Sequence, residues 1–368
     1  PKAAGDVVRN PALANTLRQI AKKGPSAFYT GPIAQEIASA VSNAPRNAVP
    51  MTLADLAAYE AKERPPVCVM YRVYRLCGMG PPSSGATTVF QILGMVERFD
   101  MKALGPDSPK AWHVIAEAMQ LAYADREKYL ADPDYVAVPV TGLLDKGYIA
   151  SRSALISENS TRASYAAGMP PGAEPRTAAI SGEVMGTTHF VAADRLGNVA
   201  SMTSTVEGPF GSQLVAAGMV LNNEMTDFSL APMKEGVLVA NRPQPGKRPV
   251  SSMSPTIVYG PDGQPIFAVG AAGGKRIIMQ VAKTLMAHLD WGMRAQAALA
   301  APNIYFSGDA ILIESGTPLA AQADALTQLG HVVRVNPISP SKANAAERTT
   351  SGWVGAADPR SDGVGLSE

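Results

Sequence analysis

The chain has 368 residues, of which 46% are hydrophobic, and its 32 basic and 31 acidic residues give a formal net charge of +1. This length and composition predict one large domain or two ordinary domains with a packed core. The charges are interspersed, with no basic run and no acidic tail, which argues against a nucleic-acid-binding protein and favours a small-molecule ligand. No apolar run is long enough to span a membrane. Because the chain begins with Pro1, we expect a fragment or a processed piece without its targeting segment.

The first half of the chain is predicted to be mostly helical. A helix over residues 10–24 has Asn10 as its N-cap and Gly24 beyond its end. Its apolar residues, which share one face, are Leu13, Leu17 and Ile20. Further helices are predicted over residues 31–43, over 50–63 with Thr52 as the N-cap, and over 109–132. The inward-facing residues of the longest helix are Trp112, Ile115, Met119 and Ala122.

Residues 65–79 are typical of extended chain and contain both cysteines of the sequence, Cys68 and Cys77. They lead into a turn-rich stretch over residues 80–85. Two cysteines in a chain of this length do not make a disulfide scaffold, so we expect buried thiols rather than a bridge.

Residues 155–186 are rich in serine, alanine, glycine and proline and have no period, which predicts a mobile linker that ends at Gly186. After it the chain becomes rich in β-strand patterns. A hairpin is predicted over residues 187–205, a strand over 218–223, and a second hairpin with an Asp-Gly turn over 254–274. Helices over 275–291, 294–301 and 317–330 follow, the last with Thr317 as cap, and late strands are predicted over 310–315, 331–336 and 352–358. Strands flanked by helices predict a layered α/β body.

Commoner catalytic motifs are absent from the sequence. There is no G-x-S-x-G nucleophile elbow, no G-x-G-x-x-G, and residues 270–276 lack the glycine spacing and the Ser or Thr of a P-loop. A hydrolase built on serine and histidine stays open, but no spacing favours it. The histidines lack partners at metal-ligand spacing, and we expect them to be surface residues of helices and strands; they are His113, His189, His288 and His331.

The Gly186–Thr187 bond offers another chemistry. A threonine hydroxyl is a poor nucleophile unless a base lies beside it, and an N-terminal threonine carries such a base in its own α-amine, whose ordinary pKa is about 7.7–8.0. A flexible segment before Thr187 and a strand after it are the features that such a cut requires. The alternative is an ordinary strand threonine, and the pattern alone does not decide between them.

Downstream motifs, in order along the chain, resemble those of the γ-glutamyltranspeptidases, which are N-terminal-nucleophile hydrolases that cut themselves into a large and a small subunit. The small-subunit motifs are residues 186–212, 220–229, 246–258, 270–278 and 356–363, and residues 63–93 and 122–136 resemble the end of the large subunit. The resemblance runs through the whole chain. It implies residues 1–186 as the C-terminal part of the large subunit and residues 187–368 as the small catalytic subunit.

The resemblance assigns the catalytic residues. Gly186 precedes the cut, Thr187 is the nucleophile, and Thr205 is the second threonine, whose hydroxyl positions the first. The backbone amides of Gly273 and Gly274 match the oxyanion hole, where glycine lets the backbone approach a ligand closely. From the residues alone, Thr205 is an ordinary strand residue and the glycine pair is a plain turn.

The resemblance also assigns donor recognition. Ser251 and Ser252 match the hydroxyls that hold the α-carboxylate of the glutamyl group. Glu207, Glu224 and Asp227 match the positions that receive its α-ammonium, where acidic groups would pair the charge. His189 is interpreted as a supporting residue rather than a general base. The alternatives are a polar loop for the serines and solvated loop residues for the acids.

Some features depart from the family pattern. Some relatives carry amides where Glu207 and Glu224 stand, and acids here match the bacterial subgroup. Residues 228–250 are fewer than in relatives with a lid over the glutamate pocket, so no lid is implied. The part of the large subunit before residue 1, which carries the arginine that clamps the donor carboxylate in the family, is absent from this sequence, and we expect that lack to affect maturation or activity.

The resemblance therefore implies an α+β fold, a four-layer αββα sandwich that is incomplete at its N-terminal end. It implies hydrolysis and transfer of γ-glutamyl groups from glutathione and similar donors to water, amino acids or peptides, through an ester on Thr187, and a heterodimer of the two subunits. It implies no metal or organic cofactor, and it favours a periplasmic or secreted location. The alternatives are a glutaryl or cephalosporin acylase of the same fold, against which the three acids argue, and a non-catalytic fragment that never cleaves.

Overall fold

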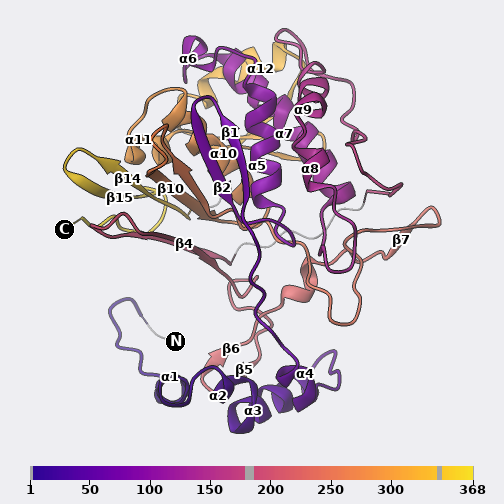
Figure 1. Ribbon diagram of the computed structural model, residues 1–368, viewed down its shortest axis with the longest axis vertical. Coiled ribbons are helices and arrows are strands. Elements are labelled where there is room, and N and C mark those ends of the chain that lie inside the picture. Colours follow the sequence, from indigo (N-terminus) through magenta and orange to yellow (C-terminus); the bar gives the residue numbers. More distant parts are fainter. Residues whose placement is uncertain (1–2, 179–185, 338–341, 368) are drawn as a thin grey trace. The chain divides into compact units, whose positions relative to one another are not determined.

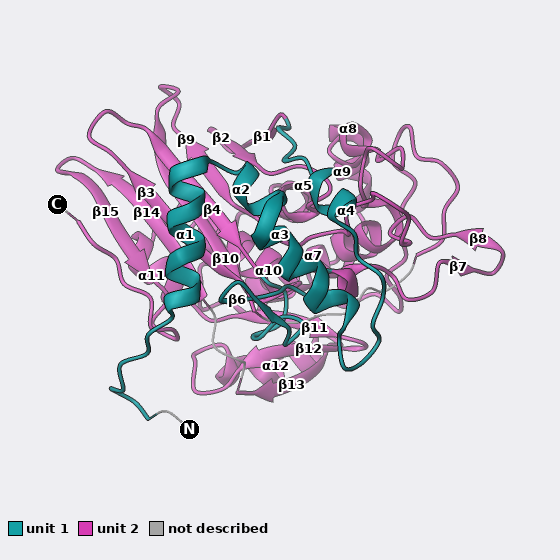
Figure 2. Ribbon diagram, turned by 90° about the horizontal axis from the view of Figure 1, so that it is seen from below, with its two compact units in different colours: residues 1–64, 206–224 teal, residues 65–205, 225–368 magenta. Residues whose placement is uncertain are grey.

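The structure is a computed structural model that describes residues 3–178, 186–337 and 342–367. The chain forms two compact units, Pro1–Arg64 with Val206–Glu224 (unit 1) and Pro65–Thr205 with Met225–Glu368 (unit 2), which Figure 2 shows in teal and magenta. The predicted linker ends inside unit 2, and residues 179–185 of it lie outside the described residues. No helix within the described ranges is long and apolar enough to cross a membrane.

Unit 1 is mainly helical. Its elements are α1 (Pro11–Lys23), α2 (Ser26–Tyr29), α3 (Gly31–Ser42), α4 (Leu53–Ala57), β5 (Val215–Ala216) and β6 (Met219–Val220). The predicted cap of α1 is confirmed, since the Asn10 side chain accepts a hydrogen bond from the Leu13 amide. The predicted apolar face of α1 is not buried at Leu17, which is 57% exposed. The buried residue of this helix is Thr16, whose hydroxyl donates a hydrogen bond to Ala217 O.

The helix predicted over residues 50–63 is shorter than expected. Thr52 caps it through a capping box with Asp55, as predicted, but α4 ends at Ala57. Residues 58–64 bury no apolar side chain, so no packing supports a longer helix there. The core of unit 1 contains Ile33, Ile37 and Leu56.

Unit 2 is built on a six-stranded antiparallel sheet in the order β1-β2-β9-β10-β14-β15. Its strands are β1 (Val67–Tyr71), β2 (Tyr74–Gly78), β9 (Thr256–Tyr259), β10 (Pro265–Ala272), β14 (Lys342–Thr349) and β15 (Gly352–Ala357). The second predicted hairpin, β9–β10, is confirmed. The strand β14 was not predicted.

The expectation of buried thiols is wrong, because Cys68 and Cys77 form a disulfide. The two cysteines face each other across the β1–β2 hairpin with their Cα atoms 4.1 Å apart. Such closely opposed pairs occur in antiparallel ladders where side chains approach each other, so the register of the hairpin brings the sulfur atoms together.

Helices cover one face of this sheet (Figure 1). The helices of this part are α5 (Gly85–Val96), α6 (Met101–Leu104), α7 (Pro109–Tyr129), α8 (Val140–Leu143), α9 (Lys146–Ser153), α10 (Arg276–Leu289) and α11 (Ala295–Ala300). α5 packs against α7 and α10, and α10 packs on β10. The predicted inward residues of α7 are confirmed, since Trp112, Ile115, Met119 and Ala122 are fully buried.

The β3 (Thr188–Ala193)–β4 (Val199–Ser204) hairpin, which was predicted, packs against β10 and β14. His189 of β3 lies against Gly270 of β10, where a Cβ atom would come within 2.2 Å of the imidazole ring. Asn344 of β14 donates a hydrogen bond to the His189 carbonyl, at 2.7 Å. Unit 2 thus combines a helical layer, a six-stranded sheet and a two-stranded layer, which is an α+β arrangement.

The remaining elements lie after β6 in the chain. They are η1 (Glu224–Asp227), β7 (Met233–Lys234), β8 (Val237–Leu238), β11 (Ile304–Ser307), β12 (Ala310–Glu314), η2 (Ala320–Gln322), α12 (Ala323–Gln328) and β13 (Val332–Asn336). The helix predicted over residues 317–330 begins later than expected. Thr317 is not its cap, because the Thr317 hydroxyl donates to Glu314 O, and helical structure begins only at Ala320, with η2 followed by α12. The predicted strands β12, β13 and β15 are confirmed.

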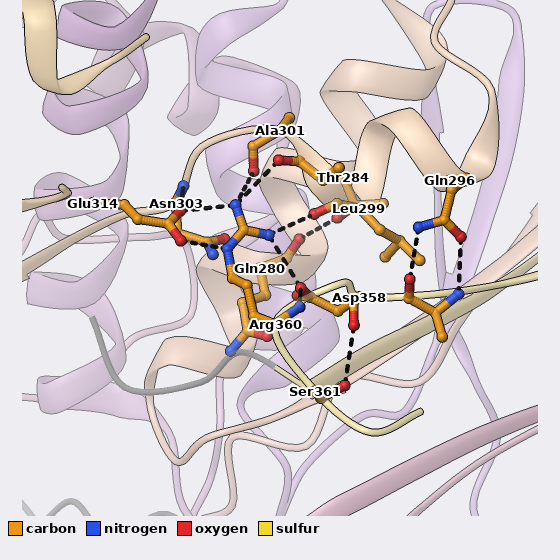
Figure 3. A network of polar contacts seen from close by, with 12 residues as sticks. Gln280, Thr284, Gln296, Leu299, Ala301, Asn303, Glu314, Asp358, Arg360 and Ser361 are labelled. Atoms are coloured by element: carbon orange, nitrogen blue, oxygen red, sulfur yellow. Dashed lines mark hydrogen bonds and ion pairs between the residues drawn. The ribbon is translucent and has the colours of Figure 1, made fainter. Parts of the chain in front are cut away.

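The terminal motif over residues 356–363 has a structural role that Figure 3 shows. The Arg360 guanidinium pairs with both oxygens of Glu314 and with Asp358, and it donates to the carbonyls of Leu299 and Ala301. These carbonyls lie at the C-terminal end of α11, where cations are favoured by the helix dipole and by the unpaired carbonyls. The motif therefore fixes the end of the chain to the end of α11.

Candidate active site

Thr187 lies at the buried start of the β3–β4 hairpin and is 7% exposed. Its Oγ1 donates a hydrogen bond to Oγ1 of Thr205, at 3.2 Å. The register explains this contact, because Thr188 pairs with Ser204 and the next positions outward are Thr187 and Thr205. The structure thus brings together two residues that the sequence placed in one site.

His189 lies on the same face of β3 as Thr187, since side chains alternate along a strand. Its ring contacts Thr203 Oγ1 through Nδ1, at 2.8 Å, and Ser201 Oγ through Nε2, at 3.4 Å. Burial lowers the pKa of His189 to about 4, so the ring is neutral at neutral pH. These hydroxyl contacts join β3 to β4 within the hairpin, which suits a supporting residue.

The prediction of surface histidines is wrong for His113, His189 and His331, which are all buried. His113 Nδ1 contacts His331 Nε2 at 2.7 Å, and His113 Nε2 contacts the Ser157 carbonyl. The sequence pattern could not show that a residue on α7 and the residue just before β13 pair in the core.

These two histidines and Glu117 form the one group in the described residues that could hold a metal ion. Two nitrogens that bind the same tetrahedral zinc at about 2.0–2.1 Å lie about 3.3 Å apart. The imidazoles at 2.7 Å instead have the spacing of a hydrogen bond. Glu117 accepts a hydrogen bond from the Tyr165 hydroxyl.

Gly273 and Gly274 form the turn between β10 and α10. Both have positive φ angles, 134° and 59°, which favour glycine. Their carbonyls accept from the Arg276 and Ile277 amides. The turn lies three residues after Gly270, which contacts His189, and Thr187 lies two residues before His189. The turn also lies at the N-terminus of the 14-residue helix α10, where negative charge is stabilised.

Ser251 and Ser252 lie in the serine loop, residues 250–254 before β9. Ser252 is buried, and its Oγ accepts a hydrogen bond from Arg126 Nη2 at 2.8 Å. Ser84 contacts the Ser251 carbonyl through both its amide and its hydroxyl, at 2.7 and 2.6 Å. Arg126 and Ser84 were not identified as site residues from the sequence, because nothing local connects residues 84 and 126 with residue 252.

The three acids divide between the two units. In unit 1, Glu207 is buried with a φ of 71° and accepts a hydrogen bond from Asn223 Nδ2, at 2.6 Å. Glu224 belongs to unit 1 and Asp227 to unit 2. The Asn241 side chain donates a hydrogen bond to the Asp227 carbonyl and accepts one from the Val250 amide. This single side chain therefore connects Asp227 to the serine loop.

Unit 2 therefore combines a buried threonine hydroxyl with a partner hydroxyl, a glycine turn at a helix N-terminus, and a loop of buried serines. A hydroxyl nucleophile with amide donors for a developing oxyanion is the equipment of acyl transfer. Serine hydroxyls such as those of the serine loop are suited to binding a carboxylate.

Comparison with known proteins identifies relatives. A model of the gamma-glutamyltranspeptidase family matches residues 1–367. A glutathione hydrolase proenzyme of Escherichia coli strain K12 is 38% identical over 374 residues, which cover 98% of this chain and 62% of the relative. An acylase ACY 1 proenzyme of Pseudomonas sp. strain SE83 is 34% identical, with 98% of this chain and 65% of the relative covered. The chain thus spans less than two thirds of the length of these relatives.

Among solved structures, the crystal structure of cephalosporin acylase from Bacillus halodurans is similar over 99% of this chain and 63% of its own, with a TM-score of 0.85 and 28% identity. This likeness confirms the α+β fold of the N-terminal-nucleophile hydrolases that the sequence predicted.

Proposed function

Because the chain belongs to the γ-glutamyltranspeptidase family, we propose that it forms part of an enzyme that hydrolyses and transfers the γ-glutamyl groups of glutathione and similar donors. The proposal includes cleavage between Gly186 and Thr187, after which Thr187 acts as the nucleophile. Residues 1–186 then belong to the large subunit and residues 187–368 to the small subunit. Both products contribute to unit 2, so they stay together as a heterodimer.

The observation that carries the proposal is the hydrogen bond between the Thr187 and Thr205 hydroxyls at the buried start of β3. The contact restricts the rotamer of Thr187, which is a positioning effect of the kind that raises reaction rates.

The cleavage step uses the same hydroxyl. Attack of Thr187 Oγ1 on the Gly186 carbonyl carbon exchanges the amide bond for an ester and moves the proton to the freed α-amine. Water then hydrolyses the ester, which leaves the Gly186 carboxylate on one product and the Thr187 amine and hydroxyl on the other. The new amine has an ordinary pKa of about 7.7–8.0, so it is partly neutral near pH 7.5 and serves as the general base.

In turnover, Thr187 Oγ1 attacks the γ-carbonyl of the donor while its proton passes to the α-amine. The amides of Gly273 and Gly274 stabilise the tetrahedral oxyanion. The intermediate collapses to a γ-glutamyl ester, and the leaving amine departs with the proton. Water or the amine of an amino acid or peptide then attacks the ester and restores the free hydroxyl.

For donor recognition, we assign the α-carboxylate to Ser251 and Ser252 and the α-ammonium to Asp227, which the Asn241 side chain holds beside the serine loop. The assignment of Glu207 and Glu224 to the same ammonium rests on the family resemblance alone.

The second candidate function is that of an acylase, which the names of two relatives favour. An acylase for a glutaryl side chain has no ammonium to bind. The preference between γ-glutamyl-p-nitroanilide and glutaryl-p-nitroanilide, which differ only in the amine, therefore separates the two functions.

The experiment that tests the proposal is expression from the complete reading frame, followed by a denaturing gel and N-terminal sequencing. We expect two polypeptides, the smaller beginning Thr-Thr-His-Phe, with release of nitroaniline from the γ-glutamyl donor. Thr187→Ala should remain one inactive chain, and the control Thr188→Ala, at an exposed position of the same strand, should cleave. A wild-type enzyme that is uncut and fully active would overturn the proposal.

A further inference from the structure

A buried arginine on α7 contacts the serine loop. Arg126 is 3% exposed, and its Nε and Nη2 donate to Ser84 Oγ and Ser252 Oγ, each at 2.8 Å. A guanidinium is planar and always charged, so these two donors have a fixed separation and direction. One side chain thus fixes the positions of the two serine hydroxyls relative to each other.

The direction of each hydrogen bond follows from the chemistry of the partners. A guanidinium has no acceptor, so Ser252 Oγ must accept from it, and the hydroxyl proton of Ser252 is directed to a different acceptor. Ser84 shows the same arrangement in full, since it accepts from Arg126 Nε and donates to the Ser251 carbonyl at 2.6 Å. The arginine therefore makes Ser252 a hydrogen-bond donor, which is what a carboxylate ligand requires.

The contacts continue from Arg126 to the glycine turn. Glu127 Oε1 accepts from Arg126 Nη1 at 2.7 Å and from Lys275 Nζ at 2.8 Å. Lys275 directly follows Gly274, and its carbonyl accepts from the Tyr123 hydroxyl. Tyr123, Arg126 and Glu127 lie on one face of α7, since residues three and four apart are neighbours on a helix. One turn of α7 thus holds both the serine loop and the glycine turn.

We infer that Arg126 is a positioning residue for the donor α-carboxylate, acting through the Ser252 hydroxyl, and that Glu127 and Lys275 fix the distance from this hydroxyl to the glycine turn. The inference rests on the proposed function, which places the carboxylate at Ser252 and the reacting carbonyl at the glycine turn. Glu127 also pairs the buried charge of Arg126, so the helix can carry a cation in its core.

The test compares two donors in the enzyme expressed from its complete reading frame. The donors are γ-glutamyl-p-nitroanilide and 4-aminobutyryl-p-nitroanilide, which keeps the amine and lacks the carboxylate. Arg126→Lys keeps the charge but cannot reach both serines. We expect kcat/KM for the first donor to fall by about tenfold or more, mainly through KM, and that for the second to stay within about twofold.

Arg152→Lys is the matched control. Arg152 is 5% exposed and also binds main-chain carbonyls and a carboxylate in unit 2, at Leu121, Ala166 and Asp125. It does not touch the serine loop or the glycine turn. We expect this variant to change kcat/KM by the same factor for both donors, as a loss of folded protein would.

A double-mutant cycle tests the route through Ser252. If Arg126 acts through that hydroxyl, Arg126→Lys should add little to the loss already caused by Ser252→Ala on the γ-glutamyl donor. Equal losses on both donors, or fully additive losses in the cycle, would overturn the positioning role and leave the proposed function intact. A correctly cut wild type that releases nitroaniline from neither donor would instead overturn the proposed function, and this inference with it.

Discussion

The two sides of the candidate site are held in different ways. Thr187 and Thr205 are 18 residues apart and meet through the register of one hairpin. Ser252 is held by Arg126, 126 residues away, and Ser251 by Ser84, 167 residues away. The hairpin side depends on local pairing, whereas the serine loop depends on the packing of the helical layer. We therefore expect changes in the hairpin to act on the acyl-transfer steps, and changes around the serine loop to act on donor recognition.

The largest effect is expected on the recognition side, for Asp227→Ala. If Asp227 pairs with the donor α-ammonium, its loss leaves a buried cation unpaired, at a cost on the order of 3–5 kcal/mol. Hydrolysis of γ-glutamyl-p-nitroanilide should fall accordingly, and that of glutaryl-p-nitroanilide, which has no amine, much less. Similar losses on both donors would show that Asp227 supports the loop without binding the ammonium.

On the hairpin side, Thr205→Ala should lower turnover by about 100-fold, because the Thr187 hydroxyl loses the contact that holds its rotamer. Hydrolysis and transfer to a dipeptide share the acylation step, so the ratio of glutamate to γ-glutamyl dipeptide should barely change. The products are separated after partial conversion of glutathione, with Ser204→Ala, an exposed neighbour, as the control. A large change in the ratio at unchanged donor consumption would place Thr205 in the acceptor step instead.

The smallest effect concerns the packing of the hairpin, through His189. Burial lowers its pKa from 6.5 to about 4, so between these values the unfolded chain binds a proton that the folded chain does not. The contribution of His189 to the free energy of unfolding should therefore fall as the pH drops below about 6.5, by about 2 kcal/mol at pH 5. His189→Gln should reduce the difference between urea midpoints measured at pH 7 and pH 5. An equal reduction of this difference in the His288→Gln variant would contradict the assignment of the pH effect to His189.

Local signals explain what the sequence predicted. Asn10 and Thr52 are N-caps, whose effect depends on residues within one turn. The β3–β4 hairpin follows from alternation on both sides of the turn-forming residues 194–197. The family resemblance placed Thr187 and Thr205 in one site, and the hairpin register, which fixes which residues face each other, is what brings them together.

Features that depend on distant partners were missed or wrong. The helix α5 is buried all round and has no polar face to give a period. The strand β14 is rich in alanine and has weak strand propensity, and its pairing with β10 and β15 decides its conformation. The His113–His331 pair and the contact of Arg126 with Ser252 join residues more than 100 positions apart, which no local pattern reveals.

The six-stranded sheet has a consequence for the order of assembly. Its strands β1 and β2 precede Thr187, the other four follow it, and β2 pairs with β9 through Leu76 and Val258. Before a cut at residue 187, formation of this sheet is a unimolecular reaction of one chain. After the cut, the same sheet joins two polypeptides, so its re-formation from separated pieces is bimolecular and slows on dilution. The unfolding midpoint of the cut protein would then rise with protein concentration, whereas that of the uncut chain would not.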